Sequence, residues 1–259
     1  DNAAYTDFAG YLELGTADYT LQVRDENQST IVAAYSAPLQ TLSLGGTAIT
    51  VLASGFLDPS ANSNGPAFGL WVALPAGGPL VALPAAAIPG ARIQVIHNSA
   101  DLAAAEVDVY LNGGLLLNDF AFRTATPFVD VQAGIDLEVA IAPSTSSSVA
   151  DALATFTYNL ADGENYTLVA NGIVSASGYS PVQPFDIYVY AGSREAATSG
   201  ATNTDVLVFH GATDAPVVDV AETAVLAGAT LVDDLPYGQV DSNHEVATND
   251  YMLQAQPVQ

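Results

Sequence analysis

An internal repeat constrains the fold of this chain of 259 residues more than any other feature. The segment "RIQVIHNSAD" (92–101) is similar to "DVLVFHGATD" (205–214), which lies 113 residues later. The segment "TVLASG" (50–55) is similar to "TLVANG" (167–172), 117 residues later. Because self-similarity at a nearly fixed spacing indicates that one structural unit is repeated, we infer a repeat of about 116 residues.

The two terminal regions share one phrase, "ADYTLQVR" (17–24) and "NDYMLQAQ" (249–256). Seven residues recur 232 positions later, at twice the repeat length: Asp1, Tyr5, Thr16, Asp18, Tyr19, Leu21 and Gln22. The sequence therefore spans two repeats and about 27 residues of a third, and it starts within a repeat. We predict the back half of a repeat at 1–88, a complete repeat at 91–201 and a front half at 203–259.

The local pattern of the chain is typical of β-structure. Short runs rich in Val, Ile, Thr, Tyr and Leu are separated by turns with Gly, Asn, Asp or Pro, as in "EVDVYLNG" (106–113). Only residues 146–156 have a pattern that allows a helical turn. We predict an all-β fold of tandem immunoglobulin-like β-sandwich repeats. Because a sandwich that lacks half of its strands cannot bury its inner faces, each half-repeat needs a partner.

Charge and composition exclude several kinds of partner. The chain has 28 acidic residues, four Arg and no Lys, which gives a net charge of −24. This charge repels nucleic-acid phosphates and anionic membrane surfaces. A chain without cysteine has no disulfide, thiolate metal site or cysteine nucleophile. The uncharged stretch 67–91 contains four prolines, which excludes a membrane-spanning helix there.

Two copies of one motif, "VIHNSADLAAAEVDVYLNG" (95–113) and "VFHGATDAPVVDVAE" (208–222), resemble a family of tandem extracellular β-domains of unknown function. That family occurs in secreted and cell-surface proteins of bacteria and archaea. Its motif, His-x-Ser/Ala-x-Asp-Ala-Pro-x-Val-Asp-Val, is matched by His97, Asp101, Val107, Asp108 and Val109, and by His210, Asp214, Ala215, Pro216, Val218, Asp219 and Val220. In the first copy "LAAAE" replaces "AP". The resemblance implies an extracellular or cell-surface location and no particular activity.

The motif histidines and aspartates allow two interpretations. An imidazole with Asp101 and Asp108, or with Asp214 and Asp219, offers nitrogen and oxygen ligands to a divalent ion, and the acid excess favours calcium. In the structural interpretation, the histidine ends the first strand and caps a turn, while Asp101 and Asp214 accept hydrogen bonds from backbone amides in Asx-turns. We expect the structural role. No Ser-His-Asp triad can be assembled from three histidines without a nucleophile elbow, so we expect no enzyme.

Aromatic residues on two matching segments suggest a second kind of site. Trp71, Tyr188 and Tyr190 lie on the matching segments "GLWVALPAGG" (69–78) and "DIYVYAGSRE" (186–195). If these rings are exposed they can stack on sugars, and if they are buried they pack against neighbouring strands.

The repeated terminal phrase has two explanations. Either the sequence is a window of a longer tandem array, or half-repeats complete one another between molecules. In the second case residues 203–259 of one copy combine with residues 1–88 of the next into a head-to-tail filament. The expected interface residues are Leu12, Leu14, Tyr19, Leu21, Val23, Val246, Tyr251 and Leu253. We expect a structural subunit of an extracellular filament with itself as partner. The alternative is an adhesin-like module that binds a glycan or a surface protein.

Overall fold

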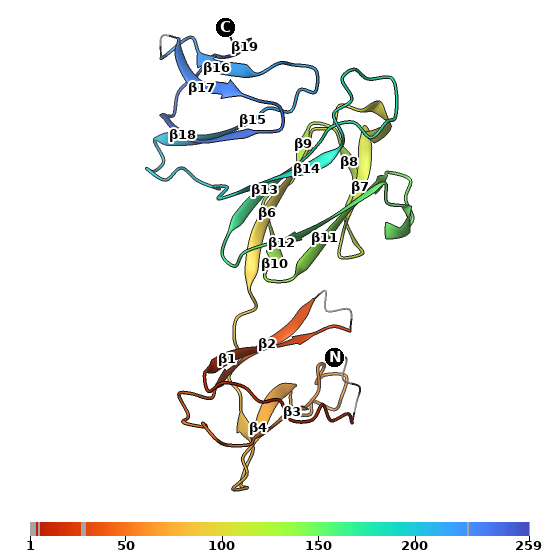
Figure 1. Ribbon diagram of the computed structural model, residues 1–259, viewed down its shortest axis with the longest axis vertical. Helices are drawn as coiled ribbons and strands as arrows, with labels where there is room; N and C mark the ends of the chain where they lie inside the picture. The colour runs from red at the N-terminus through yellow and green to blue at the C-terminus, as the bar shows by residue number, and fades with distance from the viewer. Residues whose placement is uncertain (1–3, 5, 27–29, 227, 259) are drawn as a thin grey trace. The chain divides into compact units, whose positions relative to one another are not determined.

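The computed structural model describes residue 4 and residues 6–26, 30–226 and 228–258 (Figure 1). In these residues the regular structure consists of β-strands and two short 3-10 helices, so the predicted all-β class is confirmed. No helix in the described part of the chain is long and apolar enough to span a membrane. Asp1 and Tyr5, two members of the terminal repeat, lie outside the described residues.

The chain divides into two compact units, Asp1–Pro89 and Gly90–Gln259. The first unit holds two antiparallel sheets, one of two strands and one of three: β1 (Asp18–Arg24) with β2 (Ile31–Pro38), and β3 (Thr50–Ser54), β4 (Gly69–Ala73) and β5 (Val81–Ala82). Side chains from both sheets form an apolar cluster that buries Tyr35, Val72 and Leu83. The first unit therefore has its own small core.

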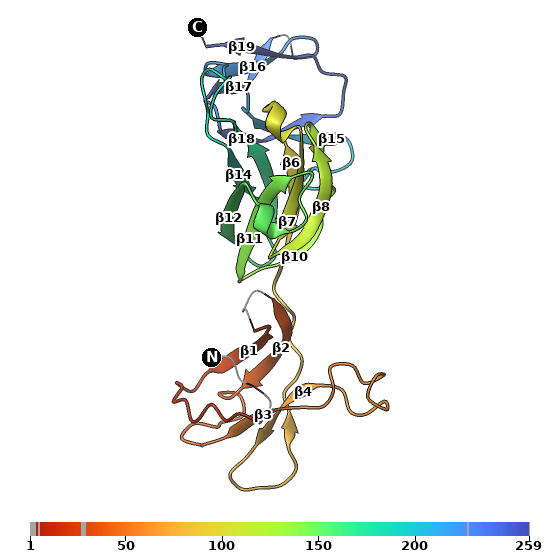
Figure 2. The same ribbon diagram turned by 90° about the vertical axis from the view of Figure 1, so that its right-hand side faces the viewer.

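The second unit begins with a β-sandwich, the central sandwich, whose two sheets face one another across a shared core (Figures 1 and 2). One sheet has the order β10-β6-β13-β14 and consists, with β9 beside β6, of β6 (Gly90–His97), β9 (Thr124–Ala125), β10 (Val129–Gln132), β13 (Asn165–Asn171) and β14 (Asp186–Ala191). The other has the order β12-β11-β7-β8 and consists of β7 (Glu106–Leu111), β8 (Gly114–Ala121), β11 (Asp136–Pro143) and β12 (Ala154–Asn159).

Alternation along the strands explains how the central sandwich forms. In β6 every second residue is buried, because successive side chains of a strand point to opposite faces of the sheet. Ile93 of β6, Leu137 of β11 and Leu168 of β13 are each 1% exposed and meet in the core. The 3-10 helix η1 (Leu102–Ala104) lies between β6 and β7, and η2 (Val149–Asp151) falls in the segment with the helical pattern.

The C-terminal part of the second unit, which we call the C-terminal strands, forms two small sheets. Their strands are β15 (Asn203–Phe209) paired with β18 (Val240–Ala247), and β17 (Ala229–Leu235), β16 (Val218–Glu222) and β19 (Leu253–Pro257) in the order β17-β16-β19. Their buried cluster contains Val220, Val232 and Leu235. Among the described residues this cluster is much smaller than the core of the central sandwich.

Two glycines 117 residues apart fix the same backbone geometry in the two units. Gly55 and Gly172 have φ values of 94° and 102°, in a backbone region that residues other than glycine rarely adopt. A Cβ atom on Gly55 would lie 2.2 Å from the carbonyl oxygen of Ala67, and one on Gly172 would lie 2.3 Å from that of Pro184. A larger residue at either position would therefore have to displace backbone.

Candidate functional site

Both motif histidines fasten the end of a strand to the turn that follows. His97 is 1% exposed, and its Nε2 lies 2.7 Å from the carbonyl oxygen of Ala104. Nε2 of His210 lies 2.9 Å from the carbonyl oxygen of Pro216. Because a carbonyl oxygen only accepts, each Nε2 carries the hydrogen. Burial lowers the pKa of His97, and the bond to Ala104 raises it by less, so this ring is neutral at pH 7.

The motif aspartates of β7 and β16 support a bend in the next strand. Oδ1 of Asp108 accepts a hydrogen bond from the amide of Asp119 at 3.0 Å, and Oδ1 of Asp219 accepts one from the amide of Asp234 at 2.9 Å. Asp119 and Asp234 both have a φ of 52°, the left-handed region. The two carboxylates therefore hold equivalent backbone irregularities, a role that the sequence analysis did not assign to them.

Asp101 and Asp214 stand at corresponding motif positions in different surroundings. Asp101 is 1% exposed and accepts five hydrogen bonds, from the amides of Ala103, Val174 and Ser175 and the hydroxyls of Ser175 and Tyr179. Burial alone would raise its pKa, but these donors lower it. Four of the five bonds come from the segment after β13. Asp214 is exposed, and the C-terminal strands, as far as their residues are described, do not include a counterpart of β13.

One group of carboxylates in the described residues has the spacing of a metal site. Oxygen atoms of Asp219, Asp233 and Asp234 lie within 4.8 Å of one another, and Asp233 and Asp234 are exposed. Oxygen ligands of this kind suit calcium, although acidic surfaces often gather carboxylates without an ion. The other metal candidates, Asp101 and Asp108, use their carboxylates for hydrogen bonds to backbone and hydroxyl groups.

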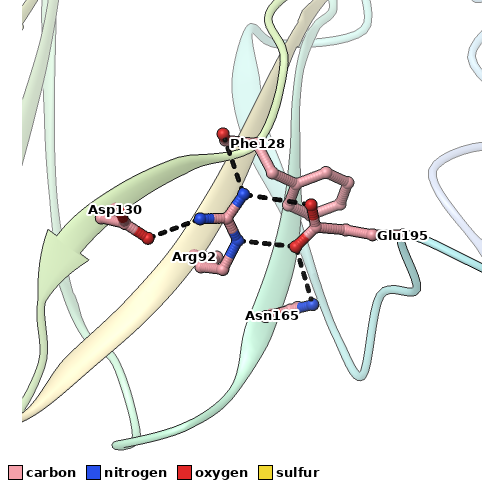
Figure 3. A network of polar contacts seen from close by, with 5 residues as sticks. All are labelled: Arg92, Phe128, Asp130, Asn165 and Glu195. Atoms are coloured by element: carbon pink, nitrogen blue, oxygen red, sulfur yellow. Dashed lines mark hydrogen bonds and ion pairs between the residues drawn. The ribbon is translucent and has the colours of Figure 1, made fainter.

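Arg92 is the centre of the most extensive ion-pair network that the structure gives for the described residues (Figure 3). Its Nη1 lies 2.6 Å from Oδ1 of Asp130, while Nε and Nη2 contact both carboxylate oxygens of Glu195 at 2.6 and 3.0 Å. Nη2 also donates to the carbonyl oxygen of Phe128, and Asn165 donates to Glu195. The network ties β6 and β10 to the segment after β14. These ion pairs keep the pKa of Arg92 above its usual range.

The aromatic residues considered as a sugar platform are half-buried. The ring of Tyr188 lies 5.2 Å from that of Phe209 and 6.2 Å from that of Tyr237, centroid to centroid. Trp71 and Tyr190 are also half-buried. Tyr188 thus packs the central sandwich against the C-terminal strands, a contact that leaves less of the ring for stacking on a ligand.

The C-terminal strands pair as the first strands of the central sandwich do. Phe209 of β15 lies opposite Val240 of β18, just as Ile96 of β6 lies opposite Ala125 of β9. The pairing of β15 with β18 therefore matches the pairing of β6 with β9 and β10. The pairs β16–β17 and β16–β19 likewise match β7–β8 and β7–β11. The first unit repeats the remaining pairings, since β1–β2 matches β11–β12 and β3–β4 matches β13–β14.

Among the residues that the structure describes, this comparison identifies strand edges without a neighbouring strand. In the central sandwich β13 lies between β6 and β14, and β11 lies between β7 and β12. In the described part of the chain, β15 pairs only with β18, β3 pairs only with β4, and β1 pairs only with β2. The unpaired edge of β15 corresponds to the edge of β6 that pairs with β13 in the central sandwich. The unpaired edge of β3 corresponds to the edge of β13 that pairs with β6. In the central sandwich the two equivalent edges, of β6 and β13, pair with one another, and we treat the edges of β15 and β3 as candidate functional sites.

The expected interface residues fall into three groups. Leu12 and Leu14 are 78% and 52% exposed and precede β1. The second group is half-buried in the cluster of the first unit: Tyr19, Leu21 and Val23. The third lies on the C-terminal strands, where Val246 of β18 pairs with Thr204, Tyr251 donates to the carbonyl oxygen of Ala247, and Leu253 of β19 is 52% exposed. Tyr19 makes the same bond to Gly15, 232 positions earlier.

Sequence reasoning missed Glu222, the last residue of β16. Its side chain is fully buried and accepts hydrogen bonds from four backbone amides, those of Ala224, Val225, Leu226 and Met252. Burial alone would raise the pKa of Glu222, but the four donors lower it to about 2. Alignment of β16 with β7 could have indicated that Glu222 is unusual, because β7 has the apolar Leu111 at the same position.

Comparison with known proteins places the chain in a family. The family described as a domain of unknown function (DUF4397) matches residues 91–221, and the chain belongs to it. The matched region covers the central sandwich and continues to β16, so it includes both copies of the histidine–aspartate motif. No curated protein matches the chain.

Proposed function

We propose that the protein is a structural subunit of an extracellular filament or cell-surface fibre. The chain consists of tandem immunoglobulin-like repeats, with a half-repeat on either side of the central sandwich. Copies assemble head-to-tail, because the first unit of one copy completes the C-terminal strands of another. The protein performs no catalytic step and needs no cofactor for this role. The complementary edges of β3 and β15 are the observation that carries the proposal.

The pairing expected at the joint follows from the central sandwich. There β13 and β6 run parallel, with Leu168 opposite Val95, and these side chains are 1% and 7% exposed. The corresponding residues are Val51 of β3 and Val208 of β15. Val51 is 43% exposed and Val208 is half-buried. Pairing β3 with β15 would remove both from water and supply main-chain hydrogen bonds along the two edges.

The chemistry of the surface suits a fibre of this kind. A head-to-tail contact uses two different surfaces of each copy, so it does not close on itself and gives an open polymer. The net charge of −24 opposes sideways clumping of the fibres, while the joints themselves are made of apolar side chains and backbone. A location outside the cell follows from the family resemblance of the two motifs and remains part of the proposal.

Electron microscopy of the purified protein at working salt tests the proposal. We expect filaments whose axial repeat corresponds to two domains per chain. Val51→Asp places a charge on the β3 edge and should abolish them. Val81→Asp is the matched control, because Val81 is 42% exposed on β5, away from the proposed joint, and should leave filaments intact. Monomers of the unmodified protein would overturn the proposal and favour the adhesin-like alternative.

A further inference from the structure

β19 lies where a different strand is needed at the joint. It pairs with β16, with Ala255 opposite Val220 and Gln254 opposite Ala221. In the central sandwich the corresponding position beside β7 belongs to β11, whose other edge carries β12. In the first unit β1 corresponds to β11 and already carries β2. One position beside β16 therefore has two candidate strands, β19 and the β1 of another copy.

The two candidates differ in how well their inward side chains fill a core. In β11 the inward residues Leu137, Val139 and Ile141 are 1%, 4% and 2% exposed. The matching residues of β1 are Tyr19, Leu21 and Val23, which are half-buried in the cluster of the first unit. The matching residues on and before β19 are Tyr251, Leu253 and Ala255. Leu253 is 52% exposed, and an alanine takes the place of Ile141. β1 is the better core strand.

Glu222 holds the start of β19 through the backbone amide of Met252, so this contact does not depend on the side chains of β19. Oε1 of Glu222 accepts a hydrogen bond from the amide of Met252 at 3.0 Å, and the amide of Thr223 donates to the carbonyl oxygen of Met252 at 2.9 Å. In the central sandwich Asn112 makes the same two bonds to Glu138. The repeat places Thr20 of β1 at the position of Met252. Because only backbone groups of the held strand take part, Glu222 can hold β1 in the same way.

We propose that β19 is a placeholder strand on β16 and that the β1 of a second copy displaces it when the two copies join. This inference rests on the proposed function and specifies the strand exchange at its joint. While β19 is in place it covers the β16 edge, which would otherwise be open to incorrect pairing. When β1 replaces it, the backbone bonds to β16 are made again, and β1 brings β2 with it, as β11 brings β12 in the central sandwich. The gain is apolar burial by Leu21 and Val23.

A reversible covalent lock on β19 tests this exchange. The chain contains no cysteine, so Ala221→Cys combined with Gln254→Cys creates one pair, at directly opposed positions of β16 and β19. Facing residues of antiparallel strands have Cα separations within the range of disulfides. The oxidised protein keeps β19 in place, and reduction frees it in the same molecule. Gln254→Cys alone is the matched control, because it changes the same strand without locking it.

We expect the oxidised double variant to remain monomeric in electron microscopy and light scattering, with assembly restored by a thiol reductant. The single variant should assemble in either redox condition. Equal assembly of the oxidised and reduced double variant, while the unmodified protein also assembles, would overturn the placeholder role and leave the proposed filament standing. If the unmodified protein does not assemble, both the filament and the exchange are refuted.

Discussion

The central sandwich and the C-terminal strands pair their β-strands in the same order but differ in burial. β6 and β15 both continue into a motif histidine bonded to a following carbonyl, and β7 and β16 both carry the aspartate that supports a bend. In the central sandwich the strands β12, β13 and β14 complete the two sheets and cover the core. The comparison teaches that sequence similarity fixes how strands pair, whereas burial depends on which further strands are present.

The largest expected effect tests that difference with two matched truncations. Leu168→Ala in β13 removes a side chain that is 1% exposed, and it should lower the free energy of unfolding by about 2–5 kcal/mol. Val51→Ala changes the corresponding residue of β3, which is 43% exposed, and should cost less than about 0.5 kcal/mol in the unassembled protein. Urea denaturation followed by circular dichroism measures both. Similar losses for the two variants would contradict the account.

A second matched pair tests the motif aspartates. Asp101→Asn weakens a buried carboxylate with five hydrogen-bond donors and should cost about 1.5–3 kcal/mol. Asp214→Asn changes an exposed side chain and should leave the stability of the unassembled protein within about 0.5 kcal/mol. Thermal unfolding of the two variants beside the unmodified protein separates these outcomes. A large loss for Asp214→Asn would show that Asp214 has structural partners in the unassembled chain.

The pH dependence of the β19 contact follows from Glu222. Its pKa is lowered from 4.5 to about 2 in the folded protein, so its carboxylate stabilises the fold above pH 4.5. That contribution is lost as the pH falls from about 4.5 to about 2. Hydrogen exchange of the Met252 amide should therefore lose protection over this range. Glu222→Gln should reduce the protection at pH 7 and remove most of its change with pH. Protection that stays constant on acidification would refute the role of Glu222.

The smallest expected effect concerns the ion pairs of Arg92. The side chain of Arg92 is 38% exposed and its partner Asp130 is 84% exposed, so water and salt screen the network. Arg92→Met, which keeps an apolar stem, should cost less than about 1 kcal/mol, and the cost should fall further in high salt. Chemical denaturation at low and high salt checks this, and a salt-independent loss above about 2 kcal/mol would mean that the network is a major source of stability.

The sequence predicted the all-β class because alternation within strands and Gly, Asn, Asp or Pro between them are local features. It also favoured a structural role for Asp101, whose carboxylate accepts a hydrogen bond from the nearby amide of Ala103. The other four hydrogen bonds to Asp101 were beyond such reasoning, since their donors come from residues 174–179, more than 70 positions away. Local pattern could not reveal how exposed Leu253 is, because exposure depends on strands outside its own segment.

Glu222 shows a second limit of sequence reasoning. An acidic residue at the end of a strand is normally expected to be exposed to water. The carboxylate of Glu222 is instead surrounded by four backbone amides, which exclude water. Three of those amides belong to the turn directly after β16, whereas the fourth, that of Met252, lies 30 residues away. The fold is needed to bring them together. From the sequence alone, only the comparison of Glu222 with Leu111, at the matching position of β7, indicated that this acid is unusual.

The pairing of β3 with β15 between copies is tested most directly by mixing two single-cysteine variants. Thr50→Cys on β3 and Leu207→Cys on β15 correspond to Thr167 and Gln94, which are directly opposed in the central sandwich. Each variant has one cysteine, so a disulfide that joins position 50 to position 207 can form only between two chains. The account predicts rapid formation of this cross-linked dimer, and much less when Val208→Cys replaces Leu207→Cys, because neighbouring residues of a strand face opposite sides. Equal cross-linking by both mixtures, or none, would contradict head-to-tail complementation.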